Sequence, residues 1–132
     1  MNKIKVGDIM KQINTPDEII SVDINDNIKQ AVEKIIQKEV HRIIVKRNNN
    51  PEKILRVTDI DVKHLNEPIK QIFDKLDRVN IISIDDDIEK IISTQDSQPV
   101  SIVYDKLKPV GIITPSDISR YIKKQNVQDE IN

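Results

Sequence analysis

The order of apolar and polar positions along the chain predicts alternating strands and helices. Apolar residues recur at helical spacing from Ile28 to Ile36, directly after an Asn25–Asn27 segment rich in N-cap side chains. Short β-branched runs bounded by polar loops predict three strands, at 19–22, 41–45 and 54–57. The last two form a hairpin, a helix begins near Thr58, and a short amphipathic segment occupies 6–13.

The second half of the chain repeats this order of predicted elements. It is predicted to contain an amphipathic helix with Ile69, Ile72, Phe73 and Leu76, a strand at 80–84, a helix with Ile88, Ile91 and Ile92 capped by Asp85–Asp87, a hairpin of 99–104 and 108–113, and a last helix through Ile118, Tyr121 and Ile122. Thr58 and Thr114 each open a Thr-x-x-Asp motif and lie 56 residues apart. Ile28 and Ile88 lie 60 apart and Val45 and Val103 lie 58 apart, so we expect two short deletions, one after the first helix and one in the hairpin loop.

Length sets the domain organisation that we expect. At 132 residues the chain suits two small units that depend on each other, since either half alone would be marginal. The predicted division is one unit at 1–66 with the N-terminal helix, a second at 67–124, and a polar tail at 125–132 that frays.

Composition and charge exclude several function classes. Charged residues make up 33% of the chain but the net charge is -1, and aromatic residues are 2%, which disfavours nucleic-acid binding. The absence of cysteine excludes disulfides and thiolate chemistry. Without a long apolar stretch we expect a soluble cytoplasmic protein with no membrane partner. The sequence contains no nucleophile, phosphate-loop or metal-ligand motif, so we expect no enzyme, no required cofactor and no metal.

The duplicated strand-helix-strand-strand-helix order, with each copy ending in a strand followed by Thr-x-x-Asp, resembles the cystathionine β-synthase (CBS) domain pair, or Bateman module. The resemblance covers almost the whole chain. Its most specific segments are 6–10, 22–32, 41–45 and 111–118. The resemblance implies an α+β fold of two CBS units, β-α-β-β-α each, packed through their sheets with pseudo-twofold symmetry.

The resemblance also implies a regulatory module that binds AMP, ADP, ATP or S-adenosylmethionine in a cleft between the units and signals to an effector protein. Asp61 and Asp117 would accept hydrogen bonds from the ribose hydroxyls. Thr58 and Thr114 would add hydroxyl contacts, and His64 and Arg120 would face phosphate. The expected base walls are Ile20, Ser21 and Val22 in one cleft and Ile81 and Ile82 in the other.

The two expected sites differ in their neighbouring residues. Gly111 permits close approach of a ligand to the backbone in the second half, where the first half has Leu55 and Arg56. We therefore expect the site with Thr114, Asp117 and Arg120 to be the stronger one.

Three simpler interpretations stay open beside this one. Thr-x-x-Asp at a helix start is also a capping box, which alone would explain both copies. Asp85–Asp87 could suggest a metal site, but acids before a helix are expected as caps. The fold could also serve as a ligand-free dimerisation or scaffold module. Whether or not the protein binds a ligand, we expect a homodimer, because the helices at 28–36 and 118–122 carry much aliphatic surface.

Overall fold

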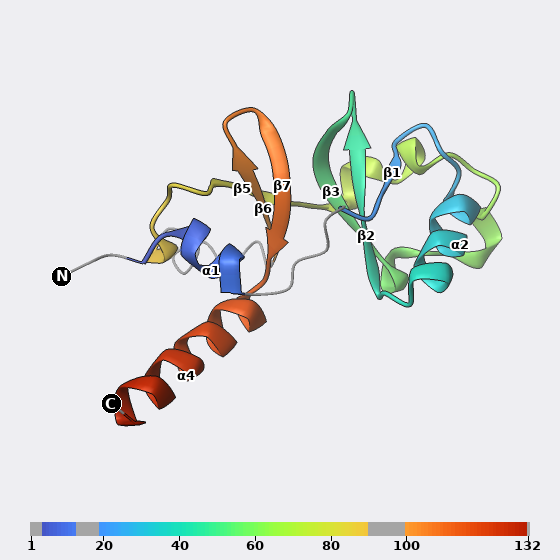
Figure 1. Cartoon of the computed structure of the whole chain (residues 1–132). Coiled ribbons are helices and arrows are strands. Elements are labelled where there is room, and N and C mark those ends of the chain that lie inside the picture. The colour runs from blue at the N-terminus through green and yellow to red at the C-terminus, as the bar shows by residue number, and fades with distance from the viewer. Residues whose placement is uncertain (1–3, 13–18, 90–99, 132) are drawn as a thin grey trace. The chain divides into compact units, whose positions relative to one another are not determined.

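The computed structural model describes residues 4–12, 19–89 and 100–131, which divide into two compact units (Figure 1). The first unit is Ile20–Val79. The second unit combines Asn80–Asn132 with Met1–Ile19, so it contains both ends of the chain. The fold class is α+β, and each unit has its own sheet and its own apolar core.

The first unit contains a four-stranded sheet in the order β1-β2-β3-β4. Its strands are β1 (Ser21–Asp23), β2 (Arg42–Arg47), β3 (Asn50–Arg56) and β4 (Asp77–Arg78). β1 runs parallel to β2, and helix α2 (Ile28–Lys38) provides the crossover between them. β2 and β3 form the predicted hairpin, and β4 pairs with β3 in antiparallel orientation.

Helix α2 forms where the sequence predicts it. Asn27 and Gln30 make a reciprocal capping box, in which each side chain accepts the main-chain N–H of the other at 2.9 and 2.8 Å. The face with Ile28, Ala31 and Ile35 is buried against the sheet. The helix ends at Glu39, whose φ of 54° is left-handed.

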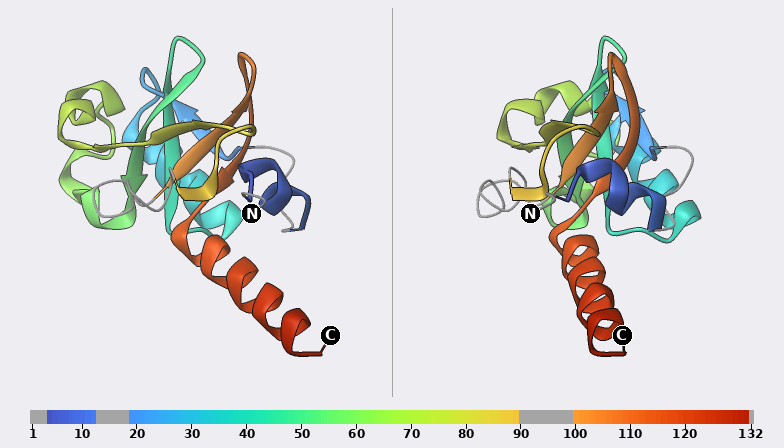
Figure 2. Two further views of the ribbon diagram at one scale, coloured as in Figure 1. Left: turned by 90° about the vertical axis from the view of Figure 1, so that its left-hand side faces the viewer. Right: turned by 60° about the vertical axis from the view of Figure 1, so that its left-hand side comes forward.

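The second unit contains a three-stranded sheet in the order β5-β6-β7, with β5 (Asn80–Ser83) parallel to β6 (Ser101–Asp105) and β6 antiparallel to β7 (Lys108–Ile113). Ile88 begins a helix as predicted, while Ile91, Ile92 and Pro99 lie outside the described residues. Helix α4 (Pro115–Ile131) follows β7 and continues well beyond the sheet of its unit (Figure 2). The segment 125–131, predicted as a fraying tail, is helical.

Each unit is completed by a segment that, in the sequence, directly precedes the strands of the other unit. Helix α1 (Val6–Gln12) lies in the second unit, where Val6 and Gly7 donate to the carbonyls of Asp86 and Ile84 at 2.8 and 2.9 Å. In the first unit, the 3-10 turns η3 (Ile69–Gln71) and η4 (Phe73–Lys75) take that place. Their donors are Ile69 and Lys70, which bond to the carbonyls of Asp26 and Ile24 at 2.9 and 3.0 Å. The predicted sequence units 1–66 and 67–124 thus each contribute one segment to the compact unit that contains the strands of the other.

Two predicted helices are replaced by 3-10 turns. The segment after β3 forms η1 (Val57–Asp59) and η2 (Val62–His64), with Ile60 extended between them. It runs from the end of α2 to its start, because Val57 donates to His41 and Lys29 donates to Leu65. Helix α2 is about 16 Å long. The eight steps from Val57 to Leu65 would advance only about 12 Å in an α-helix, so this segment must be more extended to reach from one end of α2 to the other. The second replacement is η3 and η4, where Ile69, Phe73 and Leu76 still enter the core.

The strand register shows that the two hairpins have loops of equal length. Val45 pairs with Lys53, and Val103 pairs with Gly111. The register then shifts at the same point in both hairpins, directly after Val45 and directly after Val103. The repeat spacing is therefore 58 throughout both hairpins, and the deletion that we expected in the hairpin loop does not exist.

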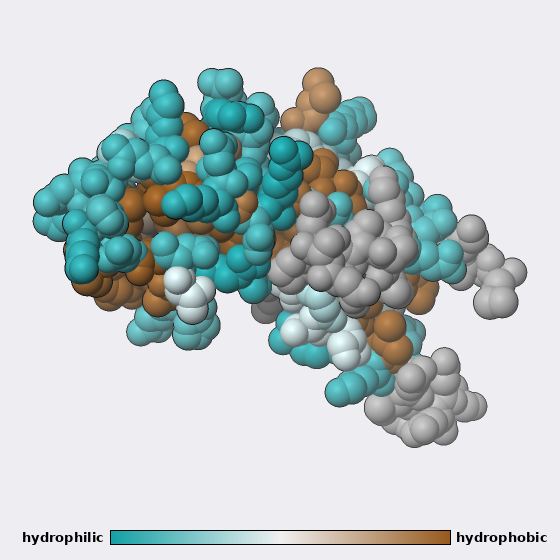
Figure 3. Space-filling model, turned by 180° about the vertical axis from the view of Figure 1, so that it is seen from behind, coloured by the Kyte–Doolittle hydropathy of each residue, from teal (hydrophilic) through white to brown (hydrophobic). Residues whose placement is uncertain are grey.

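Helices in the described part of the chain are too short or too polar to span a membrane. Figure 3 shows one face of the molecule, on which hydrophilic side chains predominate and apolar areas lie between them.

Candidate ligand-binding site

The best-formed polar site in the second unit lies at the start of helix α4. Thr114 donates its main-chain N–H and its hydroxyl to Oδ2 of Asp117, at 2.9 and 3.0 Å. The N–H of Asp117 lies 3.4 Å from the Thr114 hydroxyl oxygen, which completes a capping box. The predicted capping role is thus confirmed for this motif, and it fixes the orientation of the Asp117 carboxylate.

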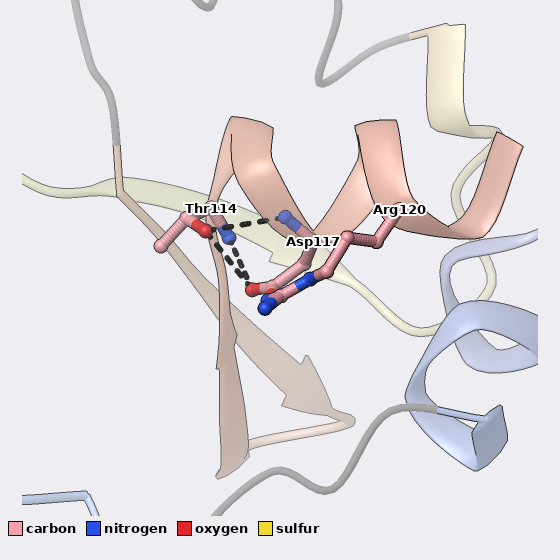
Figure 4. A network of polar contacts seen from close by, with 3 residues as sticks. All are labelled: Thr114, Asp117 and Arg120. Carbon is pink, nitrogen blue, oxygen red and sulfur yellow. Dashed lines mark hydrogen bonds and ion pairs between the residues drawn. The ribbon is translucent and has the colours of Figure 1, made fainter. Parts of the chain in front are cut away.

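Arg120 contacts the other carboxylate oxygen of Asp117. Its guanidinium folds back along α4 to Oδ1 (Figure 4). The Arg120 side chain is 69% exposed, whereas that of Asp117 is only 16% exposed. The carboxylate is therefore held in place, and the arginine is the partner that is free to move into solvent.

The two isoleucines predicted as a base wall lie on opposite faces of the second sheet. Ile81 is 48% exposed and shares its row of the sheet with Ile102 and Ile112. Ile82 is 2% exposed and lies in the apolar core, so its side chain is not accessible to a ligand. Gly111 shares the row of Ile82, on the core side.

In the first unit, the residues predicted for the equivalent site do not come together as predicted. Thr58 is exposed within η1. Asp61 caps η2 by accepting the N–H of Lys63 at 3.0 Å. The Nδ1 atom of His64 lies 2.9 Å from Glu67, and its Nε2 atom lies 3.7 Å from Asp61. This segment is an exposed local network, and the pairing of Thr58 with Thr114 and of Asp61 with Asp117 is wrong.

The structural counterparts of Thr114 and Asp117 are Arg56 and Asp59. In the strand register, the Leu55–Ile43 pair of the first unit is equivalent to the Ile113–Ser101 pair of the second. Arg56 directly follows Leu55, as Thr114 directly follows Ile113. The N–H of Arg56 donates to Oδ2 of Asp59 at 2.9 Å, as Thr114 does to Asp117. Asp59 was not among the predicted site residues, because the prediction rested on the repeated Thr-x-x-Asp motif. The 58-residue spacing of Val45 and Val103, extended along the strands, would have identified it.

The residues predicted as a base wall in the first unit also lie on opposite faces of their sheet, like Ile81 and Ile82. Val22 is buried in the core, and Ile20 packs partly against that core. Ser21 lies one position along β1 from Val22 and therefore faces the other side of the sheet, while its carbonyl accepts Lys34 Nζ at 2.6 Å. Only Ser21 among the three presents its side chain opposite the core.

The acidic run before Ile88 has local partners. Ser83 donates its N–H to Asp86 at 2.8 Å, and Lys5 forms an ion pair with Asp87 at 2.8 Å. Among the described residues, His, Asp and Glu side chains form no group of three arranged to hold a metal ion.

The two units share one order of elements, which defines the protein as a tandem of like α+β modules. A family profile for the CBS domain matches residues 6–61 and 64–124. The chain therefore belongs to the CBS domain family and carries two copies of the domain. None of the curated proteins matches the sequence.

Solved structures support the same fold at low sequence identity. A hemolysin-like protein of Oenococcus oeni PSU that contains a CBS domain is 18% identical, with a TM-score of 0.71 over 90% of each chain. A CBS-domain protein of Burkholderia ambifaria MC40-6 is 16% identical, with a TM-score of 0.71 over 90% of this chain and 93% of that chain. The CBS domain of a bacterial CNNM/CorC-family Mg²⁺ transporter is 13% identical, with a TM-score of 0.70 over 86% and 72%.

Proposed function

We propose that this protein is a regulatory module that binds an adenosine-containing ligand, AMP, ADP, ATP or S-adenosylmethionine, and passes the signal to an effector protein. A cytoplasmic location and the absence of catalysis are parts of the proposal. The observation that carries it is the orientation of Asp117 by two donors from Thr114, while its other oxygen is contacted by the exposed Arg120.

The carboxylate of Asp117 has the acceptor capacity that a ribose diol requires. A carboxylate offers about four lone-pair sites, and Thr114 uses two of them on Oδ2. If Arg120 moves away, Oδ1 is open to the two neighbouring hydroxyls of a ribose. Such charge-assisted hydrogen bonds are shorter and stronger than neutral ones.

Arg120 then has a second role in the bound state. Its exposed guanidinium can exchange the Asp117 carboxylate for a ligand phosphate, which it binds with two parallel N–H donors. Ligand binding thus replaces one ion pair by another and keeps the charge of Arg120 balanced. The aliphatic surface at Ile81 supplies a wall for the base.

A thermal-shift screen with AMP, ADP, ATP, S-adenosylmethionine, adenosine and GTP tests the proposal. A ligand that binds only the folded state stabilises it by about 2.7 kcal/mol at a concentration one hundred times its Kd. We expect at least one adenosine compound to raise Tm by several degrees. The proposal fails if every adenosine compound leaves Tm unchanged at millimolar concentration.

The variant Arg120→Ala separates the phosphate contact from the ribose contact. Removing Arg120 should weaken AMP and ATP but not adenosine, because adenosine has no phosphate and gains free access to Oδ1 of Asp117. Ser119→Ala, on the exposed neighbouring position of α4, is a matched control that should change neither ligand.

A dimerisation module that needs no ligand is the second candidate. Ile36 on α2 is 69% exposed and Ile122 on α4 is 40% exposed, and both belong to the helices for which an interface was predicted. Most of that predicted aliphatic surface is already buried inside each unit, as for Ile28, Ile35 and Ile118. The observations therefore favour the ligand-binding role.

A further inference from the structure

The place that Thr114 and Asp117 occupy in the second unit is filled by different chemistry in the first. Arg56 stands in the position of Thr114 and offers no hydroxyl to cap or to contact a ribose. Its side chain instead donates to the carboxylate of Asp77 at 2.7 Å, across strands β3 and β4. This ion pair has a structural reason, because Arg42 lies directly opposite Arg56 and two adjacent guanidiniums repel each other.

The helix that follows Asp117 also has no equivalent after Asp59. η1 ends at Asp59, and Ile60 is extended, whereas α4 continues for 17 residues from Pro115. The side chain of Asp59 belongs to an exposed residue, so any hydrogen bond that it makes to a ligand competes with water. The first unit therefore has a carboxylate acceptor in Asp59, but this carboxylate is exposed to water.

At two further equivalent positions, the first unit lacks a residue type that the proposed site of the second unit uses. Three residues after Asp59 the chain has Val62, where the second unit has Arg120 three residues after Asp117. On the face of the sheet opposite the core, Ser21 takes the place of Ile81. The phosphate contact and the apolar wall are thus both missing from the first unit.

We infer that the chain binds one adenosine ligand per polypeptide, at the Thr114–Asp117 site, and that its counterpart around Arg56 and Asp59 has a structural role, with Arg56 paired to Asp77, and takes no nucleoside. This inference rests on the proposed function and specifies which half of the protein carries it. The ion pair of Arg56 with Asp77 holds β4 to the end of β3 and leaves the first unit to support the fold.

Calorimetric titration of the full chain with AMP, and separately with ATP, tests this inference. We expect a stoichiometry near one ligand per chain. Asp117→Ala should weaken binding by about tenfold to a hundredfold, the usual cost of losing a charged hydrogen-bond acceptor. Asp59→Ala should leave Kd within about twofold, as an exposed position outside the site does.

Two variants guard against an effect on folding alone. Asp59→Asn keeps an acceptor for the Arg56 N–H, and Asp77→Ala removes the ion pair without touching the turn. Both should bind AMP and ATP like the wild-type chain, while Asp77→Ala lowers Tm. A stoichiometry near two, or weaker binding by Asp59→Asn, overturns this inference and leaves the proposed function intact. Absence of binding of AMP, ADP, ATP and S-adenosylmethionine by the wild-type chain overturns both.

Discussion

Asp59 and Asp117 make the same contact in the two units: each carboxylate accepts, at 2.9 Å, the N–H of the residue three positions before it. The two aspartates differ in what surrounds that contact. Asp117 has a threonine hydroxyl, a long helix and an arginine beside it, whereas Asp59 has Arg56 and a single 3-10 turn. The same local hydrogen bond therefore belongs to the proposed ligand site in one unit and to a single turn in the other.

Asp117→Ala should reduce ligand affinity more than Asp61→Ala. Asp61 only caps η2 and lies in an exposed segment, so its loss costs about 1 kcal/mol of stability or less and leaves binding unchanged. Loss of the Asp117 carboxylate costs about 1.5 to 3 kcal/mol of binding free energy. Calorimetry on both variants provides the comparison. Equal affinities of wild type and Asp117→Ala would mean that the motif serves only as a helix cap.

An adenosine nucleotide should stabilise the protein more than the matching guanosine nucleotide. The wall at Ile81 is aliphatic and suits the base face, while the guanine edge needs an acceptor for its N–H groups. Thermal shifts with ATP and GTP at equal concentration measure the difference. A shift with GTP that equals or exceeds the shift with ATP would contradict the proposed base preference.

The chain should form a homodimer through the helix positions that stay exposed. Light scattering should give a mass near twice 15.2 kDa, and Ile36→Glu should return it toward 15.2 kDa by placing a charge in the contact. Leu107→Glu is a suitable control, because Leu107 is also exposed but lies in the β6–β7 turn. A wild-type mass of 15.2 kDa would show that Ile36 and Ile122 face solvent.

Glu39→Gly should stabilise the first unit. Glu39 has a φ of 54°, a left-handed conformation that costs a side-chain-bearing residue about 1 kcal/mol and costs glycine nothing. We expect Tm to rise by about 2 to 5 °C. Glu33→Gly, at an exposed position inside the same helix, should instead lower Tm, since glycine costs about 1 kcal/mol there. A fall in Tm for Glu39→Gly would mean that the Glu39 side chain makes a stabilising contact.

Stability should decline at strongly alkaline pH. Burial raises the pKa of Tyr104 above its ordinary value of 10.0, and the hydrogen bond and charge of Asp87 raise the pKa of Lys5 above 10.5. Each group binds its proton more tightly in the folded state, so its contribution is complete below the unfolded pKa and is lost as the pH rises through the folded one. Tyr104→Phe should reduce the loss of Tm between about pH 9 and 11. An unchanged pH profile for Tyr104→Phe would exclude this residue as a cause.

The sequence predicted the strands and α2 well, because Ile28, Ala31 and Ile35 have clear helical spacing and Asn27 provides a strong cap. The resemblance singled out Thr114, Asp117 and Arg120, and the structure brings them into contact because they lie close together in the sequence at the start of α4. The prediction missed Asp59, because the role of Asp59 follows from the strand register set by the 58-residue spacing of Val45 and Val103, and not from the repeated Thr-x-x-Asp motif. The sequence also could not predict that α1 packs with the second unit, because the partners of Val6 and Gly7 are about 80 residues away.

The exchange of α1 and η3–η4 sets the order in which the protein can fold during synthesis. The first unit is one continuous segment and can close as soon as Val79 has left the ribosome. The second unit needs α1, which precedes the first unit in the chain, and β7 and α4, which follow it. Helix α1 must therefore wait, with its apolar face exposed, until α4 has been translated. Such long-range closure is slow, and we expect the first unit to be complete before the proposed ligand site forms.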